Sequence, residues 1–201
     1  MGWLKMEDVR AQPINWGKKL FELRDYTPIP LIILALLVEK PVIASVTFGL
    51  ILIFFGEALR VYCSSFITGI SRTRSSSLGG RLVTEGPFTF VRNPIYVSNF
   101  FVTIGLAVYT GVVWFVFLSI FLFCLQYYFI VLYEESLLRA KFGEEYIEYC
   151  QKVPAFFPKK LPRLDALEVP PDVSLSKAIK NEKRTFMAIF SVLFALVLFS
   201  N

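Results

Sequence analysis

Long uninterrupted apolar runs dominate the pattern of this chain. They extend over residues 27–38, 42–61, 95–109, 112–133 and 185–200. A membrane-spanning helix needs roughly 17–25 apolar residues, whereas transmembrane strands alternate apolar and polar positions, and these runs do not alternate. The pattern therefore predicts an all-α integral membrane protein with about five membrane helices, although the last run is short for a full span.

Charged and Pro- or Gly-rich interruptions separate these runs. Residues 1–26 mix charges with large apolar side chains and predict an interfacial helix. The short interruptions at 39–41 and 110–111 predict tight turns, so the runs on either side of each should form two helical hairpins. Residues 63–94, rich in Ser, Gly and Arg, are expected to form a polar loop between the two hairpins.

The part of the chain that follows the fourth run is more polar. Residues 134–153 have helical periodicity but too many charges to span a bilayer, so they should lie on the membrane surface or cap a pocket. Residues 158–184 form a Pro- and Lys-rich segment whose "SLSKAIKNEKR" portion resembles a basic surface helix, although a polar connector is the favoured interpretation. The chain thus divides into an N-terminal segment 1–26, a core 27–158 and a tail 159–201. The final apolar run of this tail could form a homodimer, cover the pocket or anchor the chain.

Composition and charge support a membrane topology. Apolar residues make up 55% of the 201 residues, and the formal net charge is +5. Most Lys and Arg residues fall in the N-terminal segment, the 63–94 loop and the 134–184 tail, which the positive-inside rule assigns to the cytoplasm. The positive charge therefore indicates orientation and attraction to anionic lipid headgroups rather than nucleic-acid binding.

Cysteine and histidine usage narrows the chemistry further. Cys63, Cys124 and Cys150 are scattered, which predicts neither a metal cluster nor a disulfide framework. The chain contains no histidine. A histidine-assisted nucleophile, a histidine-ligated metal and a histidine-bound haem are therefore excluded, and no metal site is predicted.

Two polar features remain, and the 95–133 hairpin should bring them together on the cytoplasmic side. They are the loop 85–96 and the pair Glu134-Glu135. Two buried carboxylates need a nearby cation, which Arg92, Arg139 or a cationic ligand could supply. Glu135 and Arg139 have i,i+4 spacing, so they could pair on one helix. Glu134 has no such local partner and is the better candidate for binding a ligand ammonium.

The same two segments carry a family resemblance. The string "RLVTEGPFTFVRNPIY", followed after two helices by "EESLLRAKFGEEYIEYCQKVPAFFP", resembles the membrane methyltransferases that include isoprenylcysteine carboxyl methyltransferase and the phospholipid N-methyltransferases. The similarity covers roughly residues 47–158. It implies a pocket of cytoplasmic loops and helix ends that encloses S-adenosylmethionine, with a lipid-facing opening for the second substrate.

The resemblance also implies roles for individual residues. Glu134 would bind the ammonium of the methionine part, and Arg92 would suit the ligand carboxylate or an anionic group of the acceptor. Tyr96 or Phe90 would stack on the purine. Arg92, Asn93 and Tyr96 are the implied catalytic residues. The implied cofactor-binding residues are Gly86, Pro87, Phe90, Val91, Arg92, Asn93, Pro94, Tyr96, Glu134 and Glu135.

Departures from the family pattern leave the acceptor open. Asn93 replaces the usual histidine of the loop, which resembles the phospholipid N-methyltransferases. Residues 142–154 instead resemble the carboxyl-methylating branch, yet residues 127–130 lack the arginine that is thought to meet the substrate carboxylate there. An isoprenylcysteine carboxylate would need no base, whereas a phospholipid amine must lose a proton. The expected partners are therefore membrane lipids and a lipid or prenylated acceptor.

Simpler interpretations stay open beside this one. Asn93 and Pro94 could only cap and start a helix, and Glu134-Glu135 could be the solvated end of a span. Glu57 and Arg60 could pair with each other or contribute to the pocket. A non-catalytic relative with a decayed pocket is an alternative function. A sterol-reductase-like oxidoreductase using NADPH is another, although the chain is short for it.

Overall fold

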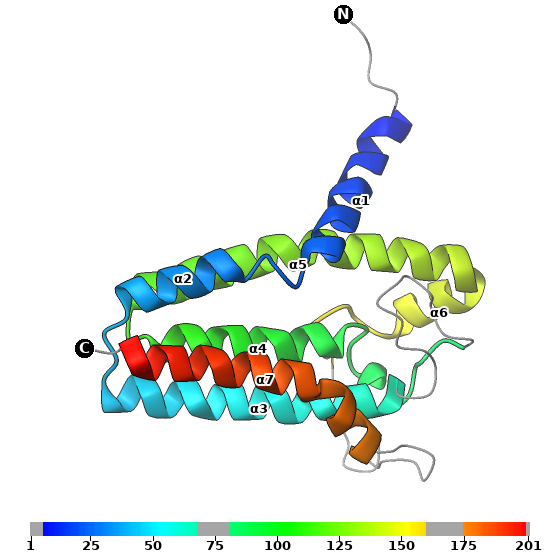
Figure 1. The fold of residues 1–201 in the computed structure, drawn as a ribbon. Coiled ribbons are helices and arrows are strands. Elements are labelled where there is room, and N and C mark those ends of the chain that lie inside the picture. Colours follow the sequence, from blue (N-terminus) through cyan, green and yellow to red (C-terminus); the bar gives the residue numbers. More distant parts are fainter. Residues whose placement is uncertain (1–5, 68–80, 160–174, 200–201) are drawn as a thin grey trace, which may run out of the picture.

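The computed structural model describes residues 6–67, 81–159 and 175–199, which form helices and connecting turns (Figure 1). No strand occurs within these ranges, which confirms the all-α prediction for the described part of the chain. The helices are α1 (Met6–Leu23), α2 (Ile29–Val38), α3 (Ile43–Ile67), the 3-10 helix η1 (Gly86–Thr89), α4 (Pro94–Tyr109), α5 (Val113–Phe142), α6 (Glu144–Lys152) and α7 (Leu175–Phe199).

Helices α3 and α4 pack backbone against backbone because glycines line their contact. A Cβ atom on Gly49 would lie 2.7 Å from the carbonyl oxygen of Gly105, and one on Gly56 would lie 2.9 Å from the carbonyl oxygen of Ser98. Small residues allow this close approach in membrane helix pairs. The contact fixes α4 against α3 and thereby fixes the first turn of α4, where the predicted site residues begin.

Helix α5 is the longest element, with 30 residues, and it continues past the bundle towards α6 (Figure 1). The C-terminal part of α1 packs on α5, where a Cβ atom on Gly17 would lie 2.1 Å from the carbonyl oxygen of Phe129. The other end of α1 projects away from the bundle (Figure 1). The sequence prediction of a helix in the N-terminal segment is therefore confirmed.

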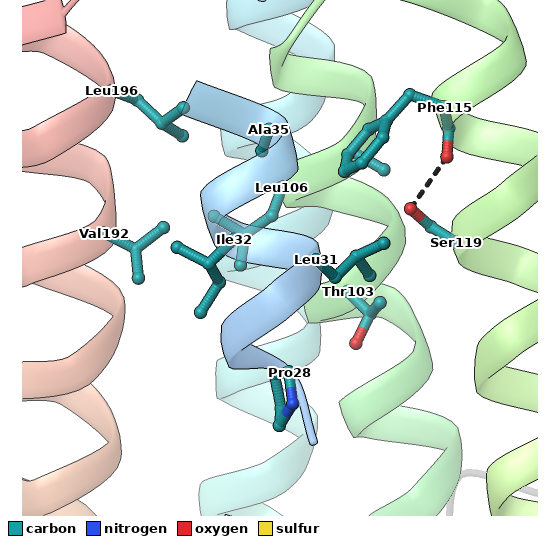
Figure 2. A pocket seen from close by; sticks show the side chains of 11 residues that line it. Pro28, Leu31, Ile32, Ala35, Thr103, Leu106, Phe115, Ser119, Val192 and Leu196 are labelled. Carbon is teal, nitrogen blue, oxygen red and sulfur yellow. Dashed lines mark hydrogen bonds between the residues drawn. The ribbon is translucent and has the colours of Figure 1, made fainter. Parts of the chain in front are cut away.

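Helix α7 packs against α3 and α2, and together with α4 and α5 it encloses a small apolar cavity (Figure 2). The cavity measures about 70 Å³ and is lined mainly by aliphatic side chains, with Val192 and Leu196 of α7 facing Ile32 and Ala35 of α2. Its α4 residues lie roughly two turns or more beyond the first turn of that helix. The cavity therefore belongs to the apolar core of the bundle.

Two helices of the described part, α3 and α5, are long and apolar enough to cross a membrane. Only 22% of the most apolar window of each is buried inside the protein. Large apolar side chains point outwards instead, among them Ile43 at 89% exposure and Phe54 at 76%. Such surfaces favour a lipid environment over water. An integral membrane protein is the interpretation that fits, and the multi-pass count of about five helices stays a prediction.

Several predicted boundaries were wrong. Helix α3 continues to Ile67, because residues 63–66 are buried, so the loop predicted over 63–94 begins later. Helix α5 continues to Phe142, so Glu134-Glu135 lies inside a helix and not at its end. Helix α7 begins at Leu175, within the segment interpreted as a polar connector, because its polar first half includes a buried residue, Glu182, that pairs with α3.

Candidate functional site

The loop before α4 folds compactly against the end of α3. Gly86 has a φ of +56°, and a Cβ atom there would lie 2.4 Å from the ring of Phe66, so the position suits only glycine. The Thr89 hydroxyl donates to the carbonyl of Gly86 at 2.7 Å. Pro87 and Phe88 are buried. The predicted loop residues Gly86 and Pro87 therefore set the shape of the turn.

Arg92 ties this loop to the segment that follows α6. Its backbone N–H donates to the carbonyl of Pro154 at 2.8 Å, and its Nη1 donates to the carbonyls of Val153 at 2.7 Å and Cys150 at 3.4 Å. These carbonyls lie at and beyond the C-terminal end of α6, where a helix leaves acceptors without intrahelical partners. A guanidinium placed there satisfies them and joins two segments that are distant in sequence.

Asn93 occupies the N-cap position of α4, and Pro94 is the first residue of that helix. The helix-start interpretation of this pair is confirmed in position, but the Asn93 side chain makes no capping hydrogen bond. Its Nδ2 instead donates to the carbonyl of Ala155 at 3.4 Å, beside a backbone N–H bond to the same oxygen at 3.2 Å. Asn93 therefore extends the contact that Arg92 makes.

Arg92 also forms a buried ion pair with Glu135 of α5. The distances to Glu135 Oε1 are 2.7 Å from Nη2 and 3.0 Å from Nε, and the side chains are 13% and 12% exposed. Burial opposes the charge of Arg92, but the hydrogen bond and the charge of Glu135 outweigh it and raise the guanidinium pKa above its ordinary value. The guanidinium therefore stays charged, and Arg92 takes the place of Arg139, the i,i+4 partner considered for Glu135.

Helix α6 covers the loop from one side. The Tyr149 hydroxyl donates to the carbonyl of Phe88 at 2.6 Å, and Tyr146, Tyr149 and Val153 form a buried cluster against which Leu82 packs. Burial raises the pKa of Tyr149 well above its ordinary value, so the hydroxyl stays a donor throughout the physiological range. We refer to the contacts of Arg92, Glu135 and Tyr149 with the loop and with the segment after α6 as the loop clamp.

Tyr96 and Glu134 form a second polar contact, between the first turn of α4 and α5. The Tyr96 hydroxyl donates a short hydrogen bond to Glu134 Oε2. The Tyr96 ring packs on Tyr127 at 4.7 Å between centroids, and Tyr127 stacks on Phe123 at 4.1 Å. Among the described residues no cation lies within ion-pair distance of Glu134, although the charge of Arg24 acts on it from further away. We call this contact the tyrosine–glutamate pair.

The two polar contacts differ in what they can bind. Glu134 has a hydrogen-bond donor but, within the described ranges, no cation at ion-pair distance, so an ammonium or sulfonium group would complete its surroundings. Arg92 already uses four of its five N–H donors on Glu135 and backbone carbonyls. The residues present thus fit the cationic groups of S-adenosylmethionine. The sequence-based assignment of Arg92 to a ligand carboxylate stays a prediction, and Arg92 has a structural task as well.

The remaining predicted residues take supporting positions. Val91 and Pro94 are buried, whereas Phe90 is half-buried and precedes them in the loop. Of the two alternatives for Glu57 and Arg60, the mutual pair is not formed, because the carboxylate that lies 3.2 Å from Arg60 Nε is that of Glu182. The structure thus brings Arg92 to Glu135, brings Tyr96 to Glu134, and gives Arg60 a partner from the tail.

Four residues near these contacts were not among the predicted site residues: Arg60, Asn99, Tyr127 and Glu182. Arg60 donates to the Asn99 side chain at 3.1 Å, and Asn99 donates to the Tyr127 hydroxyl at 3.2 Å. A sequence signal existed for part of this group, because a charged or amide side chain within an apolar helix usually has a specific partner. Glu182 carried no such signal, since it lies in a segment that looked uniformly polar.

Comparisons with known proteins show which sequences this chain is similar to. The sequence model of the phospholipid methyltransferase family matches residues 44–145, about half of the chain. The chain is 31% identical over 116 residues to the nickel-cobalt-cadmium resistance protein NccN of Alcaligenes xylosoxydans xylosoxydans, covering 58% of this chain and 51% of that protein. It is 29% identical over 113 residues to the cobalt-zinc-cadmium resistance protein CzcN of Cupriavidus metallidurans, covering 56% and 49%. The chain thus spans about half the length of these curated relatives. No solved structure matches it significantly.

Proposed function

We infer the function from the family to which this chain belongs, the phospholipid methyltransferase family. We propose that it transfers the methyl group of S-adenosylmethionine to a lipid or lipid-like acceptor, an isoprenylcysteine carboxylate or a phospholipid amine. The reaction would take place at the cytoplasmic face of a membrane that the chain crosses several times. The position of the basic segments supports this orientation.

One observation carries the proposal. Glu134 is hydrogen-bonded by Tyr96 and, among the described residues, has no cation at ion-pair distance, whereas the adjacent Glu135 is neutralised by Arg92. A carboxylate held in this way at the edge of an apolar bundle is costly unless a cation binds it. The ammonium and sulfonium groups of S-adenosylmethionine are cations of the required kind.

The residues around this position would bind and orient the cofactor and shield it from water. Tyr96 fixes the rotamer of Glu134 through its hydroxyl, and the loop clamp holds the backbone of residues 86–94 against α5 and α6. When bound, the cofactor supplies an already activated methyl group, so catalysis needs mainly alignment of the reacting atoms and exclusion of water. The absence of histidine is compatible with this chemistry.

The two acceptor classes would make different demands on the site. A carboxylate acceptor reacts as the anion and needs no base. An amine acceptor must be neutral when it attacks, so a carboxylate at the site would receive its proton. Glu134 is the candidate for that step, because Glu135 is already paired with Arg92.

Binding and transfer assays test the proposal directly. S-adenosylmethionine and NADPH are titrated separately into the detergent-purified protein by calorimetry. Labelled methyl transfer is then measured with vesicles containing phosphatidylethanolamine and with a farnesylated cysteine acid. We expect saturable binding of S-adenosylmethionine and transfer to one acceptor class. Binding of S-adenosylmethionine without transfer to any lipid would contradict the enzymatic part, and binding of neither cofactor would favour the non-catalytic alternative.

A further inference from the structure

A buried acid of α7 is joined by hydrogen bonds to the neighbourhood of the tyrosine–glutamate pair. α7 lies outside residues 44–145, which the family model matches, yet it runs alongside α3 (Figure 1). Its Glu182 is only 1% exposed. Glu182 Oε2 lies 3.2 Å from Arg60 Nε, and Oε1 accepts a hydrogen bond from the Ser64 hydroxyl at 2.5 Å. A charge buried to this degree is retained only where its partners are well placed.

Arg60 carries the contact from α7 to α4. Its Nη2 donates to Thr185 at 3.0 Å, beside Glu182, and its Nη1 donates to Asn99 Oδ1 at 3.1 Å. A guanidinium only donates, so the Asn99 carbonyl must face Arg60 and the Asn99 amino group must point the other way. Arg60 therefore decides the orientation of the Asn99 amide.

Asn99 in turn connects α4 to α5 through a hydrogen bond. Its amino group donates to the Tyr127 hydroxyl at 3.2 Å. The Tyr127 ring packs on the ring of Tyr96, whose hydroxyl donates to Glu134. The Arg60 end fixes the direction, because a flipped Asn99 amide would place an amino group beside the Arg60 cation. The arrangement therefore specifies where the Tyr127 ring, and against it the Tyr96 ring, can lie.

We propose that Glu182 is a positioning residue for the candidate cofactor site. It holds Arg60 so that Asn99 keeps its amino group on Tyr127, and Tyr127 in turn supports the ring of Tyr96 against Glu134. The effect on cofactor affinity rests on the proposed function, whereas the link from Glu182 to Tyr127 is a property of the protein alone. A family-matched core would then depend on a residue of the tail for the geometry of its site.

The link is tested first without any cofactor. The detergent-purified protein is labelled with ¹³C at the Cζ of tyrosine, and the Tyr127 signal is assigned by its loss in Tyr127→Phe. Glu182→Gln removes the charge while keeping the size of the side chain. We expect the Tyr127 signal to shift in Glu182→Gln and to stay in place in Lys183→Gln, a charge change at an exposed neighbouring position of the same helix. An unmoved Tyr127 signal in Glu182→Gln overturns the proposal.

The effect on the site is tested by a double-mutant cycle on S-adenosylmethionine affinity. Glu182→Gln should weaken binding by about fivefold to tenfold in the wild-type background and by less than about twofold in Tyr127→Phe, because the link is already cut there. A role limited to holding α7 in place predicts the same loss in both backgrounds. Equal losses therefore overturn the proposal, even where the Tyr127 signal moves.

The two readouts separate this proposal from the proposed function. If the wild type binds no S-adenosylmethionine but the Tyr127 signal responds to Glu182→Gln, the proposed methyltransferase function is overturned and the link from Glu182 to Tyr127 is supported. If the wild type binds the cofactor and the Tyr127 signal does not respond, the proposed function is supported and the link from Glu182 to Tyr127 is overturned. Glu182→Asp, which keeps the charge, should lie closer to the wild type than Glu182→Gln in both measurements.

Discussion

Glu134 and Glu135 are neighbours on α5 but belong to different regions of the molecule. Consecutive residues of a helix point in directions about 100° apart, so each side chain meets a different neighbour. Glu135 reaches the loop clamp, where Arg92 neutralises it at 2.7 Å. Glu134 reaches the first turn of α4, where Tyr96 donates a hydrogen bond but brings no charge.

The loop clamp is completed within the protein, whereas the tyrosine–glutamate pair leaves room for a charged ligand. In the loop clamp Arg92 and Glu135 pair with each other and the Tyr149 hydroxyl donates to the carbonyl of Phe88, as expected for a structural element. In the tyrosine–glutamate pair one carboxylate lacks a counter-charge among the described residues, as expected for a site completed by a ligand. The adjacent Glu134 and Glu135 thus have different roles, one in ligand binding and one in structure. Substitutions in the two regions should affect these roles separately.

Arg92→Ala should have the largest effect, on the folded state itself. The substitution leaves the buried Glu135 without its cation and frees the backbone carbonyls of Val153 and Cys150, at a cost of about 3 kcal/mol in the free energy of unfolding. The measurement is chemical unfolding in detergent. Arg81→Ala is the matched control, since it removes the 54% and 53% exposed ion pair with Glu85 and should cost less than about 1 kcal/mol. Equal losses in the two variants would contradict the clamp.

Glu134→Gln should have the next largest effect, on ligand binding rather than on folding. It removes the charge that would hold a cationic ligand group, so S-adenosylmethionine affinity should fall roughly 10- to 100-fold while the unfolding midpoint changes little. Calorimetry measures the affinity, and Glu144→Gln on α6 is the exposed control. Unchanged affinity in Glu134→Gln would mean that the ligand binds elsewhere.

Much of this comparison could be predicted from the sequence. The apolar runs predicted the four core helices, because their lengths and the turns between them are local properties of the chain. The loop at 85–96 and the acids at 134–135 were expected to meet, because a tight hairpin returns the chain to the same end of the bundle. The structure confirms that meeting, with Arg92 as the cation that pairs with Glu135 and Tyr96 as the donor to Glu134.

The partners within the site could not be predicted in the same way. Arg92 and Glu135 are separated by 43 residues, and Ser64 and Glu182 by 118. Only the folded structure therefore determines which of these side chains contact each other. The i,i+4 spacing pointed to Arg139, because sequence spacing reports only local neighbours. The polar half of α7 looked like a connector for a related reason: the partner that stabilises it, Arg60, lies on another helix.

Tyr149→Phe should have a smaller effect, confined to the clamp. It removes one hydrogen bond and leaves the buried carbonyl of Phe88 without its donor, which should cost about 1 kcal/mol in the free energy of unfolding. Cofactor affinity should stay within about twofold of the wild type, because the tyrosine–glutamate pair is not touched. Unfolding and calorimetry on the same preparation check both statements. A large loss of affinity with unchanged stability would place Tyr149 in the binding region instead.

Asn93→Ala should have the smallest effect on stability, because the side-chain bond to Ala155 is long at 3.4 Å and the backbone bond remains. The residue lies between Arg92 of the clamp and the first turn of α4, so its substitution shows to which region it belongs. We expect a change below about 1 kcal/mol in the free energy of unfolding and a larger relative loss of methyl transfer. Asn93→His should retain binding, since an imidazole can donate to the same carbonyl. Complete loss of cofactor affinity in Asn93→His, with normal unfolding, would instead mean that the ligand packs directly against this side chain.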